Sequence, residues 1–93
     1  MNVYFSWNRE KAKRNIKKHG VDFEEALTVF SDPLAAIFFD EEHSIDENRE
    51  IIIGHSVKNR LLLVSFTERD DAIRIISARV ATKKERKDYE ENV

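Results

Sequence analysis

The chain has 93 residues, of which 41% are hydrophobic and 37% are charged, with 16 Lys and Arg against 18 Asp and Glu. This length fits one domain, residues 1–93, which buries about 60–65% of its unfolded surface. The composition is too apolar for a disordered chain, and no apolar run reaches the roughly 20 residues of a membrane helix. The absence of cysteine excludes disulfides, thiol nucleophiles and thiolate metal sites. The N-terminus does not resemble a signal peptide, so we expect a soluble cytoplasmic protein with no membrane partner.

The net charge of −2 is an average over two oppositely charged segments. The segment from Asn8 to His19 has six basic residues and one acidic residue, and the segment from Asp40 to Glu50 has the reverse. Segregated charge can attract an anionic ligand to one face of a protein. On charge alone, however, two solvated surfaces are the preferred explanation.

The first elements predicted are a strand and a helix. Val3–Trp7 is short, aromatic and β-branched, which is typical of a strand. Asn8 is a good N-cap for the helix that follows, and Gly20 ends it. Two stripes run along this helix: Ala12, Ile16 and His19 on a narrow apolar face, and Lys11, Asn15 and Lys18 on a second face with Arg14 beside it.

A second helix is predicted between Asp22 and Asp32-Pro33. Asp22 and Glu25 have the spacing of a capping box, and the Asp-Pro pair ends the helix. A core-facing stripe recurs at i, i+3, i+4 and i+7, formed by Phe23, Ala26, Leu27 and Phe30.

Four strands and a last helix are predicted in the second half. The strands are Leu34–Asp40, Arg49–Val57, Arg60–Glu68 and Ala72–Ala81, separated by an acidic loop at Glu41–Asn48 and by turns at Lys58-Asn59 and Arg69–Asp71. Thr82 and Glu85 form a capping box that opens the last helix. The order is β-α-α-β-β-β-β-α. Because short turns join antiparallel strands, we expect an α+β fold with a twisted antiparallel sheet and helices packed on one face.

Most common catalytic and metal-binding arrangements are missing from the sequence. The three histidines, His19, His43 and His55, are not at ligand spacing from one another. No serine lies in a G-x-S-x-G motif, and the two glycines, Gly20 and Gly54, cannot form a nucleotide-binding loop. We therefore expect no metal and no cofactor.

Three arginines in or beside the predicted strands need a partner or a ligand, because their neighbours are apolar. If the last hairpin has a two-residue loop at Asp70-Asp71, Thr67 pairs with Arg74 and both share a face with Arg69, while Arg79 lies on the other face. A three-residue loop reverses these assignments, because a slip of one residue flips every side chain. The sequence does not decide between the two registers.

Each of these arginines has a structural explanation beside the functional one. Arg69 and Arg74 have even odds of forming cross-strand pairs with Glu68, Asp70 or Asp71. For Arg79, which lies within an apolar run, a ligand-binding role is favoured. RNA cleavage suits such a site, because the ribose 2′-OH supplies the nucleophile and arginines neutralise the phosphate in the transition state.

A series of residues with a recognisable order and spacing extends along nearly the whole chain. They are Trp7-Asn8, Lys11, Asn15, Lys18-His19-Gly20-Val21, Phe23, Glu25-Ala26, Asp32-Pro33, His43-Ser44, Arg49, Ile53-Gly54, Thr67-Glu68-Arg69, Ile73-Arg74-Ile75-Ile76-Ser77-Ala78-Arg79, Ala81-Thr82, Glu85-Arg86 and Tyr89-Glu90. In this order and spacing they resemble the BrnT-type toxins. The family usually has Asp where this chain has Asn8, and both residues cap a helix.

The resemblance implies a fold, an activity and a set of partners. The fold would be RelE-like, and the protein would be a type II toxin, a metal-independent endoribonuclease that inhibits translation by cutting RNA. Its partner would be an antitoxin of the ribbon-helix-helix type, and operator DNA would be bound only through that antitoxin.

The resemblance also implies site residues, from their positions in the pattern. Arg69 and Arg79 are the expected phosphate and transition-state ligands, and Glu68 or His19 is the expected proton acceptor. The remaining expected substrate-binding residues are Lys18, Arg49, Arg74, Lys11 and Tyr89.

Alternatives stay open for several of these residues. His19 is more often a buried structural group, Glu68 can equally pair with an arginine, and Tyr89 can pack the last helix onto the sheet. Lys11 and Asn15 are expected to shape the basic face rather than to react. For the whole protein, the alternative is a non-enzymatic module, a decayed toxin or adaptor that only binds its partner, and direct DNA binding is a weaker third option.

Overall fold

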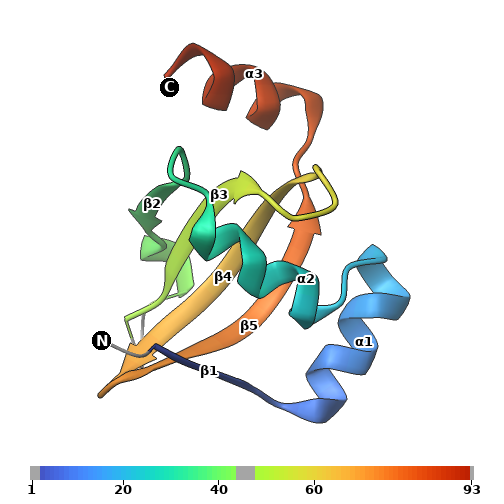
Figure 1. Ribbon diagram of the computed structural model, residues 1–93, viewed down its shortest axis with the longest axis vertical. Coiled ribbons are helices and arrows are strands. Elements are labelled where there is room, and N and C mark those ends of the chain that lie inside the picture. Colours follow the sequence, from blue (N-terminus) through green and yellow to red (C-terminus); the bar gives the residue numbers. More distant parts are fainter. Residues whose placement is uncertain (1–2, 44–47, 93) are drawn as a thin grey trace.

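A computed structural model describes residues 3–43 and 48–92. The elements are β1 (Tyr4–Trp7), α1 (Arg9–His19), α2 (Phe23–Thr28), η1 (Val29–Ser31), β2 (Ala36–Phe39), η2 (Glu41–His43), β3 (Glu50–His55), β4 (Leu61–Arg69), β5 (Ala72–Val80) and α3 (Lys83–Glu91), where η marks a short 3-10 helix (Figure 1). Apart from η1 and η2, the helices and strands follow one another as the sequence predicts. Part of the predicted acidic loop forms η2, and its residues 44–47 lie outside the described residues.

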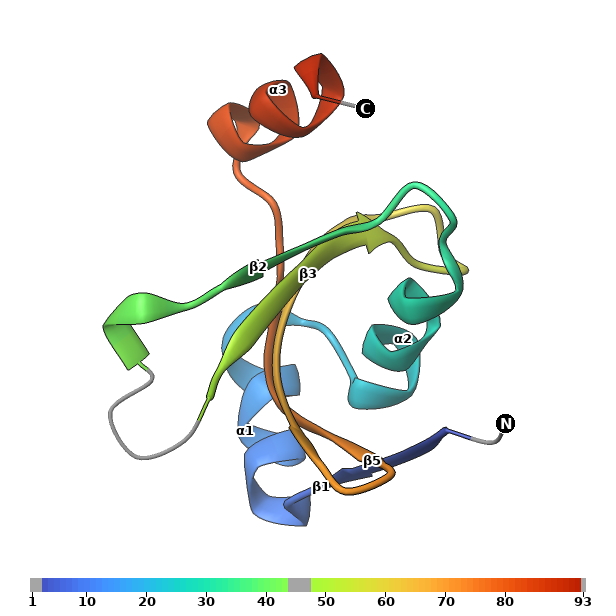
Figure 2. The ribbon, with the colours of Figure 1, turned by 90° about the vertical axis from the view of Figure 1, so that its left-hand side faces the viewer.

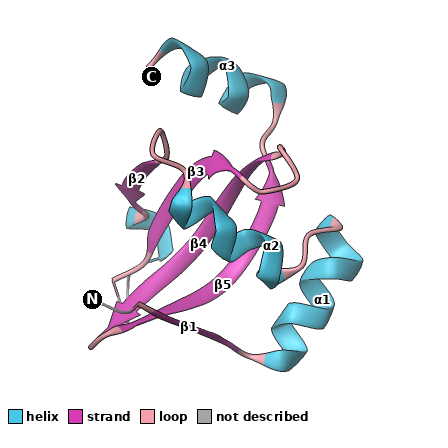
Figure 3. Ribbon diagram, in the orientation of Figure 1, coloured by secondary structure: helices cyan, strands magenta, loops and turns pink. Residues whose placement is uncertain are grey.

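All five strands form one sheet in the order β1-β5-β4-β3-β2 (Figure 3). The pairs β2–β3, β3–β4 and β4–β5 are antiparallel, as expected for β3–β4 and β4–β5 from the short turns that join them. The prediction of a wholly antiparallel sheet is wrong, because β1 pairs parallel with β5, for example Phe5 opposite Ile73. These two strands are far apart in sequence, so no turn dictates their direction.

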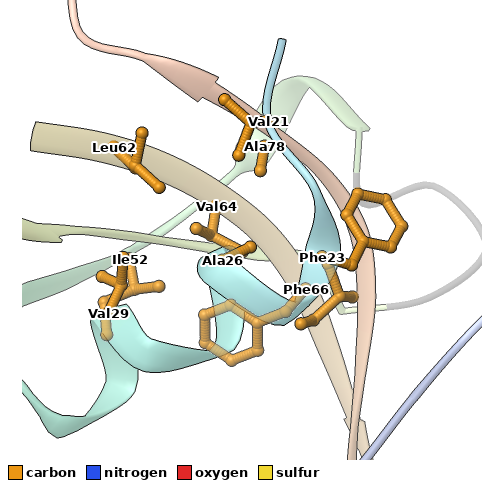
Figure 4. Close-up of a cluster of buried hydrophobic side chains, with 10 residues drawn as sticks. Val21, Phe23, Ala26, Val29, Ile52, Leu62, Val64, Phe66 and Ala78 are labelled. Carbon is orange, nitrogen blue, oxygen red and sulfur yellow. The ribbon is translucent and has the colours of Figure 1, made fainter. Parts of the chain in front are cut away.

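The main core lies between the sheet and the helices α1 and α2. Fully buried side chains of α2, β4 and β5 meet there, and Figure 4 shows them filling the space between the helix and the strands. Aromatic rings extend this core toward β1, where Trp7 packs edge-on against Phe23 at a centroid distance of 5.9 Å. The core members are Val21, Phe23, Ala26, Val29, Ile52, Leu62, Val64, Phe66, Ile75 and Ala78.

The opposite face of the sheet carries a second, smaller core beneath α3. Tyr89 of α3 packs against Ile53, Leu61 and Leu63, which alternate along β3 and β4 with the residues of the main core. Figure 2 shows α3 and α2 on opposite sides of the sheet. The prediction that the helices all pack on one face is therefore wrong. Because side chains alternate along a strand, β3 and β4 carry apolar residues on both faces, and each face needs a cover.

Helix α1 buries a polar residue where an apolar one is expected. Ile16 is 50% exposed, whereas Asn15 is only 6% exposed. The Asn15 amide donates to the carbonyl oxygens of Val21 (2.9 Å) and Ala78 (2.8 Å), and its oxygen accepts from Ala78 N (3.1 Å). Strand β1 ends opposite Ile75. Beyond that point, the Asn15 side chain forms the hydrogen bonds to Ala78 that a continuing strand would form.

The helix ends follow the predicted signals except at the two ends of α2. Its last residue is Thr28, and only the 3-10 turn η1 continues to the predicted stop at Asp32-Pro33. Gly20 ends α1 at a φ of 68°, as expected, and the Thr82–Glu85 capping box of α3 is complete. Asp22 caps α2 through Glu25 N (2.6 Å), but the capping box predicted there is not formed. The Glu25 carboxylate is instead buried and accepts hydrogen bonds from Arg60 and from Ser56 Oγ (2.6 Å). The hydrogen bonds from Arg60 hold the pKa of Glu25 below its usual value despite its burial.

A two-pronged ion pair attaches α3 to the sheet. The Arg79 guanidinium donates to both carboxylate oxygens of Glu85, at 2.7 Å each, and the same carboxylate accepts from Thr82 N at 2.9 Å. The hydrogen bonds from Arg79 lower the pKa of Glu85 to about 2. The ionised carboxylate therefore both caps α3 and holds its first turn against β5.

None of the helices in residues 3–43 and 48–92 has the length and apolar composition needed to cross a bilayer.

Replacing Asn15 tests how strongly α1 depends on its contact with the edge of β5. In Asn15→Ala, the buried N–H and C=O groups of Ala78 lose their partners, and the free energy of unfolding should fall by about 2–3 kcal/mol. Denaturant unfolding measures this, with the exposed Lys13→Ala on the same helix as the control. A loss no larger than that of the control would contradict the role given to Asn15.

The low pKa of Glu85 makes an acid-dependent contribution to stability. Its folded-state pKa is about 2 against a usual value of 4.5, so the stabilisation is complete above pH 4.5 and is lost as the pH falls toward 2. Partial solvent screening reduces the effect to about 1–2 kcal/mol. Between pH 7 and pH 2.5 the wild type should lose that much more unfolding free energy than Glu85→Gln, whereas Glu90→Gln on the same helix should follow the wild type.

Candidate functional site on the arginine-bearing face of the sheet

The β4–β5 hairpin fixes the position of two of the predicted site arginines. Its loop has two residues, Asp70-Asp71, with Asp70 at a φ of 54°. Thr67 lies opposite Arg74, and strand alternation puts Arg69 on the same face. The two-residue alternative for the loop is therefore correct, and so are the face assignments it gives for these three residues.

A β-bulge puts Arg79 on a different face from the one predicted for a regular strand. Ser65 pairs with Ser77 and Phe66 with Ile75, so Ile76 is an extra residue on β5. The shift makes Arg79 the partner of Leu63, on the same face as Arg74. The prediction that Arg79 lies on the other face is wrong, because a two-residue loop alone does not reveal a bulge five residues further along the strand.

Three of the predicted site residues thus share one face of the sheet: Arg69, Arg74 and Arg79. Arg49 immediately precedes β3, its carbonyl oxygen accepts a hydrogen bond from Asp40 N, and strand alternation puts it on the same face as Ile51 and Thr67. It is the face that α1 and α2 do not cover. Between the arginines lies Thr67, which is buried and donates a hydrogen bond to Asn48 O (2.9 Å), next to Arg49. Two more hydroxyl side chains, Ser65 and Ser77, are half-buried and face each other across β4 and β5. We refer to this surface as the arginine face.

The arginines of this face differ in their partners. Arg79 is bound to the Glu85 carboxylate, so an ion pair accounts for the position of this arginine without a ligand. Arg74 forms no ion pair within the described residues. The cross-strand pair considered for Arg74 with Glu68 is absent, because Glu68 lies opposite Ile73 and points to the other face.

Helix α1 carries three more of the predicted residues, Lys11, Lys18 and His19. They line a hollow of about 220 Å³ between α1 and β5, together with Ile76 and Ser77 of β5. His19 is half-buried there, and both lysines are exposed. The structure thus separates the predicted residues into the arginine face and this hollow, with Ser77 bordering both.

Tyr89 belongs to the packing of α3. Its side chain is buried, its hydroxyl donates to Leu34 O (3.1 Å), and its ring contacts that of His55 at a centroid distance of 5.9 Å. Burial raises the pKa of the Tyr89 phenol. This position favours the packing alternative over base stacking or proton donation.

Sequence reasoning missed one polar contact near Tyr89. Asp32 accepts a hydrogen bond from His55 N (2.7 Å), and its carboxylate lies 3.8 Å from His55 Nδ1. The backbone hydrogen bonds from His55 N and from Leu34 N (3.0 Å) hold the pKa of Asp32 below its usual value. In the sequence, Asp32 could be recognised only as part of the Asp-Pro pair that ends a helix. Gly54, the neighbour of His55, allows the close approach, since a Cβ there would lie 2.8 Å from the Cβ of Ala35.

The edge strand β2 exposes apolar side chains. All four of its residues are exposed, including Ile37 (54%), Phe38 (46%) and Phe39 (51%). Phe38 also lines a hollow of about 280 Å³ beneath α3, whose rim includes Glu85 and Asp88. Apolar side chains exposed beside an unpaired strand edge are typical of a protein-binding surface.

A metal site has no support from the described residues, in which no three His, Asp or Glu side chains gather closely enough to hold an ion.

The chain has a clear similarity to known toxins. The sequence pattern of a family described as "Ribonuclease toxin, BrnT, of type II toxin-antitoxin system" matches residues 7–85. Among solved structures, the crystal structure of the ribonuclease toxin BrnT from Brucella abortus superposes with a TM-score of 0.70, at 27% sequence identity. The match covers 88% of this chain and 100% of that chain. No curated protein sequence gives a significant match. From the family match over most of its length, the chain belongs to the BrnT family of ribonuclease toxins of type II toxin–antitoxin systems.

Proposed function

We propose that this protein is a metal-independent endoribonuclease that inhibits translation in the cytoplasm by cutting RNA, with a RelE-like arrangement of sheet and helices. The observation that carries the proposal is the gathering of four arginines on the arginine face. Family membership supports the ribonuclease activity in general. The arginine face supplies what a metal-free mechanism needs, which is positive charge directed at a phosphate.

The proposed reaction uses the nucleophile that RNA itself carries. The ribose 2′-OH attacks the adjacent phosphate, its proton passes to a base, and the 5′-oxygen of the next nucleotide leaves with a proton. Arg69 and Arg79 contact the phosphate oxygens and stabilise their added charge in the transition state, since guanidinium groups bind such oxygens in pairs. Arg49 and Arg74 hold the neighbouring backbone, and Lys11 and Lys18 extend the positive surface onto α1.

Proton transfer has two candidates, Glu68 and His19. Glu68 is exposed at the end of β4, on the face opposite the arginines, and His19 is half-buried beside Ser77. The position of His19 next to a residue of the arginine face supports it as the better acceptor. His19→Ala should then slow cleavage more than Glu68→Ala does.

The proposed partner is a ribbon-helix-helix antitoxin that alone contacts operator DNA. The exposed apolar edge of β2 supports this part of the proposal. Acidic residues lie around that edge, namely Glu41 and Glu42 after β2 and Asp88 on α3. A partner segment with apolar and basic side chains fits such a surface, whereas RNA would be repelled by it.

One observation favours the alternative of a non-enzymatic binding module. Arg79 is held by Glu85, so its charge is already balanced and its role in attaching α3 needs no substrate. Comparison of Arg79 and Glu85 variants separates the two functions, because both substitutions break the ion pair but only one removes a cation.

The arginine face is tested by growth arrest in bacteria and by cleavage of RNA in the presence of EDTA. Arg69→Ala and Arg74→Ala should each lower the cleavage rate about 10- to 1000-fold and relieve growth arrest, because each removes a phosphate contact. Arg79→Ala should lose far more activity than Glu85→Gln. The exposed Arg86→Ala on α3 serves as the control.

Circular dichroism must show that these variants remain folded at equal expression. Full growth arrest in both Arg69→Ala and Arg79→Ala would rule out the proposed site. Equal losses in Arg79→Ala and Glu85→Gln would leave Arg79 with a structural role only.

The antitoxin surface is tested with Phe38→Lys. This change puts a positive charge where a basic partner segment should bind, so affinity for the antitoxin should fall at least tenfold, as measured by calorimetry. RNA cleavage is measured in the same variant, because Phe38 lies opposite Ile51 and therefore shares the face of the sheet that carries the arginines. Ile16→Lys, at an equally exposed apolar residue on α1, is the matched control, and equal antitoxin binding by both variants would reject this surface.

A further inference from the structure

The hollow between α1 and β5 has cationic walls without balancing acids. Lys11, Arg14 and Lys18 come from one side of α1, at positions i, i+3 and i+7, and all three side chains are exposed. His19, Ile76 and Ser77 complete the lining, which includes no carboxylate. Within the described residues, none of the three cations forms an ion pair. This charge is therefore available to a ligand.

The hollow is held in shape by buried contacts. Its base includes Asn15, whose amide makes three hydrogen bonds, to Val21 and Ala78. Those bonds fix α1 against β5 immediately after the bulge at Ile76. The distance between the helix and the strand is thus set before any ligand binds, which reduces the conformational entropy that binding would cost.

The hollow also borders the arginine face. Ser77 lines the hollow and lies opposite Ser65 on that face. Its hydroxyl makes no hydrogen bond in the described part of the chain. Because of the bulge, Arg74 and Ser77 lie opposite Thr67 and Ser65 of β4, which are two residues apart, or about 7 Å at the rise of a strand. A polynucleotide on the arginine face can therefore reach the hollow within one or two nucleotides.

We propose that this hollow binds one backbone phosphate of the RNA, next to the bond that is cut, so that the strand turns around the edge of β5. Lys11, Arg14 and Lys18 supply the charge, and the Ser77 hydroxyl donates a hydrogen bond. Asn15 is a positioning residue. The inference rests on the proposed ribonuclease function, and it adds a subsite that short substrates would leave empty.

The first measurement is binding of a fully 2′-O-methylated 12-nucleotide single-stranded RNA, which the proposed reaction does not cut. The double variant Lys11→Ala/Lys18→Ala should bind at least fivefold more weakly at 100 mM salt. The slope of log affinity against log salt should become shallower by about 0.7, the value for one phosphate contact on a single strand.

The matched control is Lys13→Ala/Lys17→Ala. It makes the same charge change on the same helix, on the side that does not line the hollow. Its affinity should change less than twofold. Equal weakening in both double variants would mean that only the overall charge of α1 matters, and would overturn the proposal, as would unchanged binding by Lys11→Ala/Lys18→Ala.

The second measurement is cleavage, with an unmodified 12-nucleotide RNA and with a dinucleotide. Lys11→Ala/Lys18→Ala should slow cleavage of the longer RNA at least fivefold more than it slows cleavage of the dinucleotide; an equal loss on both substrates would overturn the subsite. If the wild type cuts neither RNA and yet the binding difference persists, the proposed ribonuclease function fails while the phosphate site stands.

Discussion

The hydrogen bonds of Asn15 to Ala78 are the contact on which the rest of the structure depends. Strand β1 accompanies β5 only as far as Ile75, and beyond that point the edge of β5 would lack a partner. The Asn15 side chain accepts from Ala78 N and donates to Ala78 O, as a neighbouring strand would. This contact fixes α1 beside the sheet, satisfies buried backbone groups and holds the strand just after its bulge. A buried amide is well suited to this position because it offers a donor and an acceptor side by side.

The bulge at Ile76 links this edge to the arrangement of charge. The extra residue returns Ala78 to the main core and turns Arg79 toward the face that carries Arg74. Without it, the alternation along β5 would put Arg79 among the apolar side chains under α2, where an ionised guanidinium would be costly to bury. The same residue also leaves Ser77 at the border between the arginine face and the hollow beside α1.

The basic and acidic segments of the chain lie on different parts of the molecule. The basic helix α1 lies beside β5, at one end of the strand order, and the acidic residues after β2 lie at the other end (Figure 1). An anionic polymer is attracted to the first and repelled by the second. A protein partner with basic and apolar side chains has the opposite preference. The surfaces proposed for RNA and for the antitoxin therefore differ in the sign of their charge.

Local sequence signals determined the elements, because caps, glycines and tight turns act over a few residues. Asn8, Gly20 and the Thr82–Glu85 box bound their helices as predicted. The choice between a two- and a three-residue loop at Asp70-Asp71 was left open by the sequence, and the structure has the two-residue loop. The sequence likewise sufficed to recognise the family and to single out the arginines.

Contacts between distant residues decided the remainder. The parallel pairing of β1, the face covered by α3, the burial of Asn15 and the side on which Arg79 lies all depend on residues far apart in the chain. The pattern of Glu25 with Asp22 predicts a capping box, yet Arg60, 35 residues away, takes the carboxylate. Periodicity and spacing report only on neighbours along the chain, so the tertiary structure alone determined these positions.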